Sequence, residues 1–364
     1  MKGRRGPEVN RGELALDRRE FLKASLVLGG ALAVPGGLLA ACGGGGERGG
    51  GGGLTRIRYQ LDWIKNSQFS GFYVADSEGY YAEEGLQVDL LPGADVASHE
   101  AVVAGGGAEI GTSSFLSRTV DAINAGSDLV VVGAGLQRSP IGLLSLPDNP
   151  IRTARDILGK RIGLQEGATA EIRLILELNG LPPDDWIEVP VGFDPSPLVE
   201  GQVDAYYAYL TNQPLILEDM GVEYVAVSFD ELGWEQYGML AITKRSYLQE
   251  NRDRVVGFMR ATIKGWERTV ADPDLGVRLT MQYGKDLGLE EDVEAKTLRA
   301  QLPFMQSELT DQKGLYWMDL DRLAGPMYEA LRKGGRDRIP EPEVLTDLSV
   351  LEEVFGGKNR LLES

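Results

Sequence analysis

Residues 62–69 are the stretch of this chain whose side chains are best suited to holding a small molecule. Trp63 and Phe69 offer flat apolar faces, and Asp62 and Asn66 offer hydrogen-bonding groups in the same short segment. Aromatic walls with a few polar groups are typical of small-ligand pockets, and these suit a planar ring with a polar edge. The alternative is that the two aromatic residues belong to the core, but their occurrence together in one loop favours a binding site.

The flanking sequence predicts a strand–helix–strand unit that positions this loop. Apolar and polar residues alternate over 57–61 and again over 86–90, which is the period of a half-buried strand. Between them we expect a helix over 68–84, capped by one of residues 66–67 and ended by a left-handed Gly85. The candidate loop then lies at the carboxyl end of the first strand, where open α/β sheets bind their ligands.

Further candidates follow the next strands of this first part of the chain. Ser113 and Ser114 come after a strand over 108–111. They could cap the following helix over 115–124 or face the ligand, and capping is the more common role. An apolar run typical of a buried parallel strand leads to Gln137, whose amide could meet a carbonyl or ring nitrogen.

A second strand–loop–helix unit suggests a second lobe with its own contribution to the site. Glu166 and Thr169 lie in a loop before a predicted helix, a place where backbone N–H groups bind anions or carbonyls. Tyr209 ends a predicted strand and Asn212 follows it, and we include both as ligand contacts. Tyr237 lies where the chain is expected to return to the first lobe, and we include it as well.

Catalytic and metal sites are not indicated by the residue types. The chain has one histidine and one cysteine. We expect His99 on a surface helix away from the 62–69 loop, so no Ser/His/Asp set can be built around it. The sequence contains no metal-ligand cluster, and we expect neither catalytic residues nor a cofactor.

The N-terminal segment indicates export and anchoring. Residues 17–23 resemble the twin-arginine export consensus, and an apolar run follows them. The run ends in Leu39-Ala40-Ala41-Cys42, which resembles a bacterial lipobox whose cysteine is lipidated. The alternative is a plain signal anchor with an incidental cysteine. A lipidated Cys42 would leave no thiol for a disulfide or for nucleophilic catalysis.

Composition divides the chain into five parts. Residues 1–41 are the signal peptide, and 42–54 form a Gly-rich tether too flexible to build a core. We expect the first lobe over 55–146, the second over 147–235, and a return to the first lobe with C-terminal helices over 236–364.

Charge limits the class of partner. The whole chain carries a formal charge of −18 and its first 41 residues carry +3, which leaves −21 for the remainder. Nucleic-acid binding requires a basic face, so we exclude it.

The 62–86 region resembles the thiamine-precursor and aliphatic-sulfonate branch of the substrate-binding proteins of ABC importers. The residues that carry the resemblance are Leu61-Asp62-Trp63, Asn66, Gly71-Phe72-Tyr73-Val74-Ala75, Gly79-Tyr80-Tyr81 and Glu84-Gly85-Leu86. The resemblance implies a two-lobed α/β fold of the type II periplasmic-binding-protein class, in which each lobe is a mostly parallel sheet flanked by helices and the ligand lies in the interlobe cleft. It also implies a monomer that delivers its ligand to a membrane permease and its ATPase.

The resemblance leaves two function classes and several ligands open. Precursor-binding relatives usually have His where this chain has Phe69, whereas Gln68-Phe69-Ser70-Gly71 is more similar to the riboflavin-binding branch. Related thiamine pyrimidine synthases share the fold, but they depend on an active-site His and a Cys-rich iron motif. We therefore favour a binding protein over an enzyme.

Charge near the expected site bears on which ligand is bound. Sulfonate, nitrate or taurine would require an unopposed cation, and we expect Asp62 and Glu166 to offset the two nearby cations, Lys65 and Arg138. A neutral aromatic heterocycle, riboflavin or a thiamine pyrimidine precursor, is the leading prediction.

Overall fold

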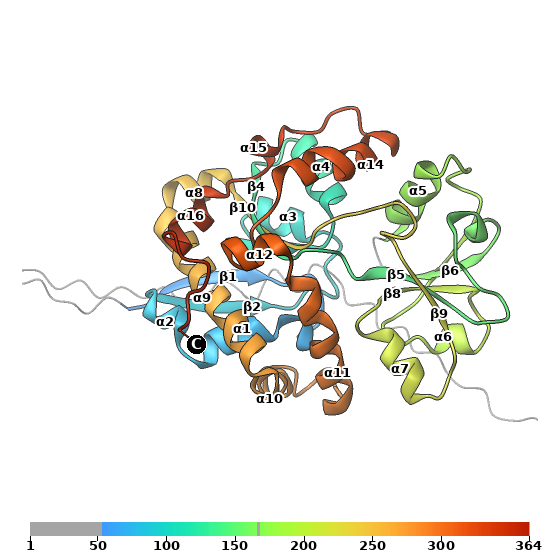
Figure 1. Ribbon diagram of the computed structural model, residues 1–364, viewed down its shortest axis with the longest axis horizontal. Coiled ribbons are helices and arrows are strands. Elements are labelled where there is room, and N and C mark those ends of the chain that lie inside the picture. Colours follow the sequence, from blue (N-terminus) through green and yellow to red (C-terminus); the bar gives the residue numbers. More distant parts are fainter. Residues whose placement is uncertain (1–52, 166–167, 364) are drawn as a thin grey trace, which may run out of the picture. The chain divides into compact units, whose positions relative to one another are not determined.

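The computed structural model describes residues 53–165 and 168–363, which belong to one compact unit, and contains two five-stranded sheets (Figure 1). The first sheet has the order β2-β1-β3-β10-β4 and the second has the order β7-β6-β8-β5-β9. The strands of the first are Leu86–Leu91, Thr55–Gln60, Ile110–Ser113, Gly238–Lys244 and Leu129–Leu136 in that order. Those of the second are Ile187–Pro190, Arg161–Leu164, Ala205–Tyr209, Ile141–Ser145 and Val225–Ser228.

Both sheets have the same pattern of strand direction. In each, one strand runs antiparallel to both of its neighbours: β10 in the first sheet and β5 in the second. The other pairings are parallel. The predicted α/β fold with two mostly parallel sheets is therefore confirmed.

The chain passes between the sheets before β5 and again before β10. The expected first lobe over 55–146 includes β5, but this strand pairs with β8 and β9 of the second sheet. The first crossing therefore comes before Ile141 rather than after Ser145. The antiparallel direction of β5 follows from this crossing, because the strand enters its sheet from the site-facing edge.

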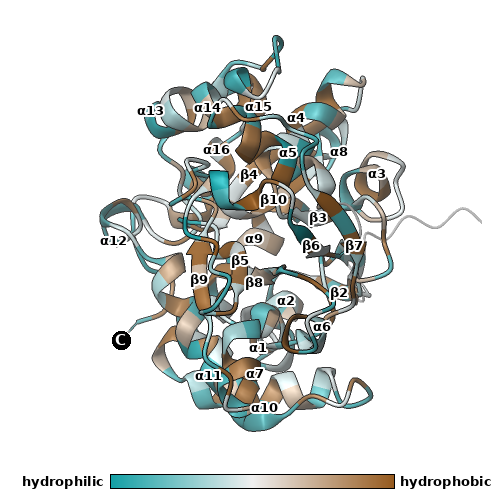
Figure 2. Ribbon diagram, turned by 90° about the vertical axis from the view of Figure 1, so that its right-hand side faces the viewer, coloured by the Kyte–Doolittle hydropathy of each residue, from teal (hydrophilic) through white to brown (hydrophobic). Residues whose placement is uncertain are grey.

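Helices cover the two sheets, whose strands β4, β5 and β10 are largely apolar (Figure 2). Those between the sheet strands are α1 (Ser70–Ser77), α2 (Tyr80–Glu83), α3 (His99–Ala104), α4 (Leu116–Asn124), α5 (Thr169–Leu178), α6 (Ser196–Val199) and α7 (Gln213–Asp219). After β10 come α8 (Arg245–Glu250), α9 (Arg252–Ala271), α10 (Pro273–Tyr283), α11 (Glu291–Gln301), α12 (Glu308–Lys313), α13 (Leu320–Arg322), α14 (Tyr328–Lys333), α15 (Pro342–Leu345) and α16 (Ser349–Phe355). None of the helices in the described ranges is long and apolar enough to cross a membrane.

The prediction of a single helix over 68–84 is wrong, because the structure has a 3-10 turn and two helices there. A 3-10 turn over Ser67–Phe69 leads into α1, and Gly79 separates α1 from α2. Gly79 has a φ of 77°, a left-handed conformation that ends one helix before the next begins. The predicted left-handed Gly85 is confirmed by its φ of 73°.

The packing of α1 against α9 holds the candidate loop in place. A Cβ on Gly71 would lie 2.2 Å from the Trp266 ring, and one on Gly265 would lie 2.1 Å from the Gly71 carbonyl oxygen. The two helices therefore cross at glycines, because no side chain fits between them. This crossing buries Trp266 and fixes the start of α1, which directly follows the 62–69 loop.

The buried hydrophobic residues do not form one separate core for each sheet. One cluster fills the first lobe around β1, α1 and α9, and a small one fills part of the second lobe. A third cluster joins both lobes, because Leu331 of α14 and Leu174 of α5 belong to it. The C-terminal helices thus pack onto the second lobe as well as the first.

Candidate functional site

A pocket lies between the two lobes where the parallel strands of both sheets end. The loops after β1, β3, β6 and β8 all contribute to it, as the rule for open α/β sheets predicts. It encloses about 830 Å³ of space, including the part open to solvent. Its lining consists of Asp62, Trp63, Asn66, Gln68, Gly93, Ala94, Val96, His99, Ser114, Phe115, Arg118, Ile141, Gln165, Ala168, Phe193, Tyr207, Tyr209, Asn212, Gln213 and Thr297.

Aromatic rings from both lobes face this pocket. Trp63 follows β1 in the first lobe, and Phe193 follows β7 in the second. Their ring centroids are 6.2 Å apart with an interplanar angle of 38°. Phe115 from the first lobe and Tyr207 and Tyr209 from β8 extend the aromatic lining. Burial raises the pKa of both tyrosines, so both remain neutral hydrogen-bonding groups at physiological pH.

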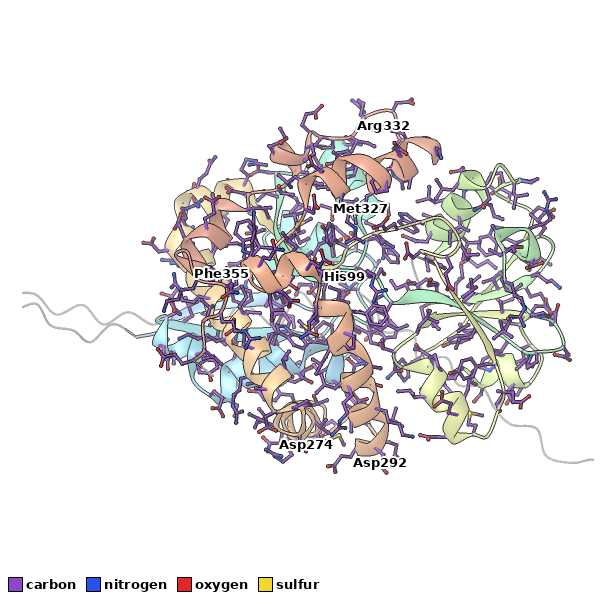
Figure 3. The ribbon with its side chains drawn as sticks, in the orientation of Figure 1. His99, Asp274, Asp292, Met327, Arg332 and Phe355 are labelled. Carbon is purple, nitrogen blue, oxygen red and sulfur yellow. The ribbon has the colours of Figure 1, made fainter. Side chains whose placement is uncertain are left out.

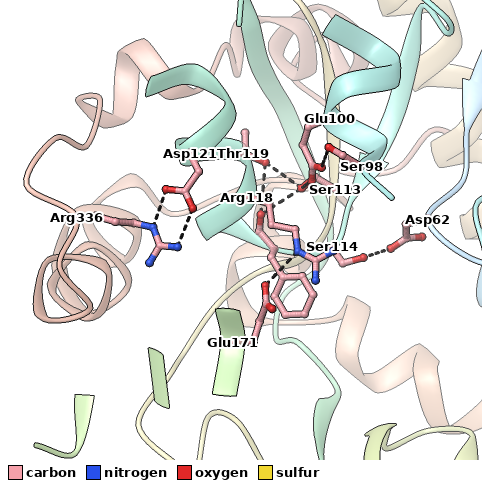
Figure 4. A network of polar contacts seen from close by, with 11 residues as sticks. Asp62, Ser98, Glu100, Ser113, Ser114, Arg118, Thr119, Asp121, Glu171 and Arg336 are labelled. Atoms are coloured by element: carbon pink, nitrogen blue, oxygen red, sulfur yellow. Dashed lines mark hydrogen bonds and ion pairs between the residues drawn. The ribbon is translucent and has the colours of Figure 1, made fainter. Parts of the chain in front are cut away.

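Asp62 is a buried carboxyl group with one unused oxygen. Its side chain is 8% exposed, and Oδ2 accepts a hydrogen bond from the Ser114 hydroxyl (Figure 4). Oδ1 has no hydrogen-bond partner among the described residues. Burial raises the pKa of Asp62, and the neighbouring His99 and the Ser114 hydrogen bond oppose that rise. A buried acceptor without a partner is costly, so this oxygen is suited to a ligand that donates a hydrogen.

His99 lies at the pocket, contrary to the expectation of a surface position. It is the first residue of α3 (Figure 3) and is buried. It lines the pocket with Asp62. Its Nε2 lies 3.0 Å from the Gly93 carbonyl oxygen. Because a carbonyl only accepts, Nε2 carries the hydrogen. The expectation failed because the Gly93 N–H donates to the Trp63 carbonyl oxygen at 2.9 Å, which holds the segment before α3 beside the 62–69 loop.

Arg118 and Glu171 join the two lobes at the edge of the pocket. Arg118 of α4 donates from Nε to Oε1 of Glu171 in α5 at 3.1 Å (Figure 4). The guanidinium also lies over the Phe115 ring, 4.4 Å from its centroid. Burial raises the pKa of Glu171, although Arg118 opposes this rise. Burial would lower the pKa of Arg118, but the Glu171 carboxylate reverses that effect and raises it.

A second set of polar contacts joins the lobes on the other side of the pocket. The Asn212 side-chain amide donates to Thr297 Oγ1 at 3.0 Å, and Thr297 belongs to α11. Nearby, Lys296 of α11 forms an ion pair with Asp219 of α7 at 2.7 Å. Helix α11 therefore contributes Thr297 to the pocket lining and contacts the second lobe at two positions.

The structure brings half of the predicted contact residues to the pocket. Asp62, Trp63, Asn66, Ser114, Tyr209 and Asn212 line it. Glu166 and the lipidation candidate Cys42 lie outside the described residues. The cations named from the sequence, Lys65 and Arg138, do not appear in the lining, and Arg118 does.

Phe69 and Ser113 do not line the pocket. Phe69 is 0% exposed and packs against Phe72, because the 3-10 turn before α1 directs its ring under the helix into the core. Ser113 is buried on the other side of β3, where it donates to Oε1 of Glu100 at 2.5 Å. Neither Ser113 nor Ser114 caps α4, whose N-cap is Phe115 without a side-chain cap bond.

The other three candidates are held by neighbouring segments. Both polar atoms of the Gln137 side chain are used by the C-terminal segment, with Trp317 O at 2.9 Å from Nε2 and Ser307 Oγ at 3.0 Å from Oε1. The Tyr237 hydroxyl accepts from the Asp319 backbone N–H at 2.8 Å. Thr169 donates to Glu188 Oε2 at 2.8 Å. These contacts depend on chain segments far away in sequence, which local patterns do not reveal.

Several lining residues were missed by the sequence reasoning. Phe193 follows a strand end in the same way as Trp63, so the rule that selected one could have selected the other. Tyr207 lies two positions before Tyr209 on the same face of β8. Arg118 and Thr297 lie within helices and carry no local signal. Across residues 53–165 and 168–363, no group of three or more His, Cys, Asp and Glu side chains could hold a metal.

Known proteins of similar sequence include binding proteins and a synthase. The riboflavin-binding protein RibY of Chloroflexus aurantiacus is 30% identical over 275 residues, covering 73% of this chain and 77% of that protein. The formylaminopyrimidine-binding protein of Halalkalibacterium halodurans is 29% identical, covering 70% and 79%. A 4-amino-5-hydroxymethyl-2-methylpyrimidine phosphate synthase of Legionella pneumophila is 26% identical, covering 70% and 81%.

Solved structures and the family profile agree with the fold. The periplasmic aliphatic sulphonate binding protein SsuA of Escherichia coli superimposes with a TM-score of 0.61 at 17% identity, covering 82% of this chain and 99% of that one. At this identity the similarity establishes the two-lobed periplasmic-binding-protein fold only. The profile of the NMT1/THI5 like family matches residues 66–275. This chain therefore belongs to the NMT1/THI5 like family and has the two-lobed periplasmic-binding-protein fold.

Proposed function

We propose that this chain is the extracytoplasmic substrate-binding lipoprotein of an ABC importer, and that it captures a flat, uncharged heterocycle between its lobes. Riboflavin is the leading ligand and a formylaminopyrimidine is the next. The relative with the higher identity of the two binding proteins described above is named for riboflavin, which supports this order.

The observation that carries the proposal is the pair of aromatic side chains from opposite lobes. Two stacking contacts of about 3.5 Å each require about 7 Å between ring faces. The Trp63 and Phe193 centroids are 6.2 Å apart, so a small separation of the lobes would admit one flat ring. Stacking a flat heterocycle on an aromatic side chain contributes roughly 1–3 kcal/mol by comparison with nucleobases. In this arrangement Phe193 takes the role that the sequence suggested for Phe69.

Asp62 would define the polar edge of the ligand. Its unpartnered oxygen would accept an N–H hydrogen, such as the imide N–H of a flavin or the amino group of a pyrimidine. Neither a sulfonate group nor a nitrate ion has a hydrogen to donate there, and the carboxylate would repel both. The pocket chemistry therefore favours the heterocycles over the anions.

The cellular setting follows from the N-terminal sequence. Export by the twin-arginine route and lipidation of Cys42 would leave the folded unit tethered to the membrane by the Gly-rich segment 43–53. There, a monomer would load its ligand and dock on the permease. The strongly negative charge of the chain outside the signal peptide is in keeping with an extracytoplasmic binding protein rather than a nucleic-acid partner.

A fluorescence titration tests the ligand assignment directly. Riboflavin fluorescence should be quenched on binding, because its ring would stack against Trp63. Formylaminopyrimidine, taurine and nitrate serve as competitors, and a thermal-shift assay reports binding independently, since a ligand at 100 Kd adds about 2.7 kcal/mol of stability. If the protein at micromolar concentration binds formylaminopyrimidine and not riboflavin, the flavin assignment is wrong. Binding of taurine or nitrate alone would overturn the heterocycle proposal.

A second function, pyrimidine synthesis, is favoured by one observation. His99 lines the pocket beside Asp62, and related synthases depend on a histidine in their active site. Against this, Cys42 is the single cysteine of the chain, whereas the resemblance associates the synthases with a Cys-rich iron motif. Incubation of the purified protein with pyridoxal phosphate and iron separates the two functions. A new pyrimidine product would establish the enzyme, and its absence in the presence of tight ligand binding supports the importer component.

A further inference from the structure

The pocket lining contains one strongly basic side chain. Arg118 is the sole lysine or arginine among the described residues that line it. A guanidinium in a pocket is the usual receptor for phosphate or sulfonate groups, because its N–H fork matches their oxygens. Whether Arg118 can serve an anion depends on what already binds it.

Glu171 from the opposite lobe already engages this guanidinium. Its carboxylate is 1% exposed and accepts from Arg118 Nε at 3.1 Å, and its second oxygen has no partner among residues the structure describes. An anionic ligand would have to compete with this buried carboxylate for the positive charge of Arg118, and Glu171 left buried without its cation would be strongly destabilised. Arg118 is also fixed over the Phe115 ring, so the guanidinium has little freedom to turn toward a ligand.

The other acidic residues near the pocket also disfavour an anionic ligand. Asp62 lines the pocket, and Glu100 is buried behind it, bonded to Ser113. Because Glu171 compensates the charge of Arg118, the carboxylates of Asp62 and Glu100 would repel a doubly charged phosphate ester. The chain outside the signal peptide, at −21, adds a weaker long-range repulsion.

We infer that Glu171 is a specificity-determining residue: by neutralising Arg118, it makes the pocket accept an unphosphorylated heterocycle and reject its phosphate ester. The inference rests on the proposed function and narrows it to the uncharged form of the ligand. Specificity of this kind depends on a penalty against the wrong ligand rather than on an extra contact to the correct one. For an importer component, this would exclude phosphorylated cofactors that carry the same ring.

The test compares riboflavin with riboflavin 5′-phosphate on the full-length protein and three variants. Fluorescence titration gives Kd for each ligand, and the readout is the ratio of the two values. Glu171→Gln removes the neutralising charge and keeps a hydrogen-bonding group of the same size. Glu188→Gln is the matched control, because Glu188 is an exposed acid of the same lobe that does not line the pocket.

We expect the wild-type protein to bind riboflavin 5′-phosphate at least roughly tenfold more weakly than riboflavin, which corresponds to about 1.4 kcal/mol. In Glu171→Gln the ratio should fall to about threefold or less, whereas Glu188→Gln should keep the wild-type ratio. The double variant Arg118→Gln/Glu171→Gln should reject the phosphate ester again, because the attracting cation is gone. If the single Glu171 variant folds poorly, the wild-type ratio still tests whether the pocket rejects the phosphate ester.

Four results would overturn the inference. Equal or tighter wild-type binding of riboflavin 5′-phosphate would show that the pocket accepts anions. An unchanged ratio in Glu171→Gln would show that another residue sets the discrimination. If neither flavin binds while a pyrimidine does, the flavin assignment fails, and equal binding of hydroxymethylpyrimidine and its phosphate would then overturn the inference. If no heterocycle binds at all, the proposed function fails and this inference fails with it.

Discussion

Trp63 and Phe193 face each other from opposite lobes, with ring centroids 6.2 Å apart and planes tilted by 38°. Each residue follows the carboxyl end of a parallel strand, β1 in one sheet and β7 in the other. Lobe opening would separate the rings, and closure brings them together. Ligand stacking and lobe closure are therefore coupled in this geometry, since a ring held by both side chains resists reopening.

Removing either ring should weaken ligand binding. Trp63→Ala and Phe193→Ala should each raise the riboflavin Kd about 10- to 100-fold, because each removes roughly 1–3 kcal/mol of stacking. Quenching of flavin fluorescence should be lost in the Trp63 variant and reduced in the Phe193 variant. Trp186→Ala is the control: this indole packs at the surface of the second lobe, bonds to the Pro183 carbonyl oxygen and does not line the pocket. Equal losses of affinity in all three variants would argue against a stacking role.

Replacing Asp62 should stabilise the ligand-free protein and weaken binding. Burial raises the pKa of Asp62, so the folded state binds the proton more tightly than the unfolded state. The contribution of this group to stability is present at low pH and is lost as pH rises from about 3.9 through the folded pKa. At pH 7 the free energy of unfolding of Asp62→Asn should therefore exceed that of the wild type by about 1–3 kcal/mol, which raises its unfolding temperature. Near pH 3 the two proteins should be equally stable.

The measurement is thermal unfolding from pH 3 to pH 8 together with a riboflavin titration at pH 7. Loss of a charged hydrogen-bond acceptor should raise Kd by about tenfold or more. Asp286→Asn, at an exposed position, serves as the control and should change neither quantity. An Asp62→Asn variant that is less stable than the wild type at pH 7 would mean that this carboxylate stabilises the fold instead of binding the ligand.

Thr297→Val should speed ligand release. The Asn212–Thr297 hydrogen bond joins the second lobe to α11, and its loss removes about 0.5–1.5 kcal/mol from the closed state. Stopped-flow measurements should show a dissociation rate increased about 2- to 10-fold with little change in the association rate. Thr310→Val is a matched control, because that threonine lies in α12 away from the pocket. A change confined to the association rate would contradict the role in closure.

Ligand binding should make the folded unit more compact. The described conformation has interlobe contacts on both sides of the pocket, from Arg118 to Glu171 and from Asn212 to Thr297, as expected of a closed clamp. Two crossings of the chain, before β5 and before β10, would act as the hinge. Small-angle scattering should give a smaller radius of gyration with saturating ligand than without it. Identical profiles would count against a hinge motion.

Cys42→Ser should release the protein from membranes into the soluble extracytoplasmic fraction. The lipid on this cysteine is the proposed anchor, and no helix in the described ranges is suited to span a bilayer. Fractionation of cells, followed by detection of the protein in each fraction, measures the result. Retention of the Ser variant on membranes would show that the apolar segment before residue 42 remains as an anchor.

Local sequence determined the fold class and the position of the site. The alternation of apolar residues around Ile57 and Val88 is a property of single strands, so it predicted β1 and β2 without tertiary information. The position of Asp62 and Trp63 after a strand end was also local, and the rule for open α/β sheets converted it into a site. The two strands are confirmed, and both residues line the pocket, because these features depend on short-range geometry.

The tertiary structure decided which side chains of the candidate segments reach the pocket. Phe69 and Trp63 belong to one loop, but a single 3-10 turn directs one ring into the core and leaves the other at the pocket. In the sequence, Gln137 is indistinguishable from a binding residue. In the structure, its side-chain amide is hydrogen-bonded to the C-terminal segment. The sequence predicts a surface position for His99, because nothing local to α3 indicates that this helix begins beside Asp62.

The residues contributed by the second lobe and by α11 depend on the same long-range packing. The Arg118–Glu171 pair and the Asn212–Thr297 contact each join segments from different lobes. Their existence depends on how the lobes close, and no periodicity within either segment encodes it. The sequence by itself therefore determined most of the strands and the place of the 62–69 loop, whereas the assignment of β5 to the second sheet required the structure. Only tertiary packing decided its charge balance, because a buried ion pair is defined by two partners brought together from distant parts of the chain.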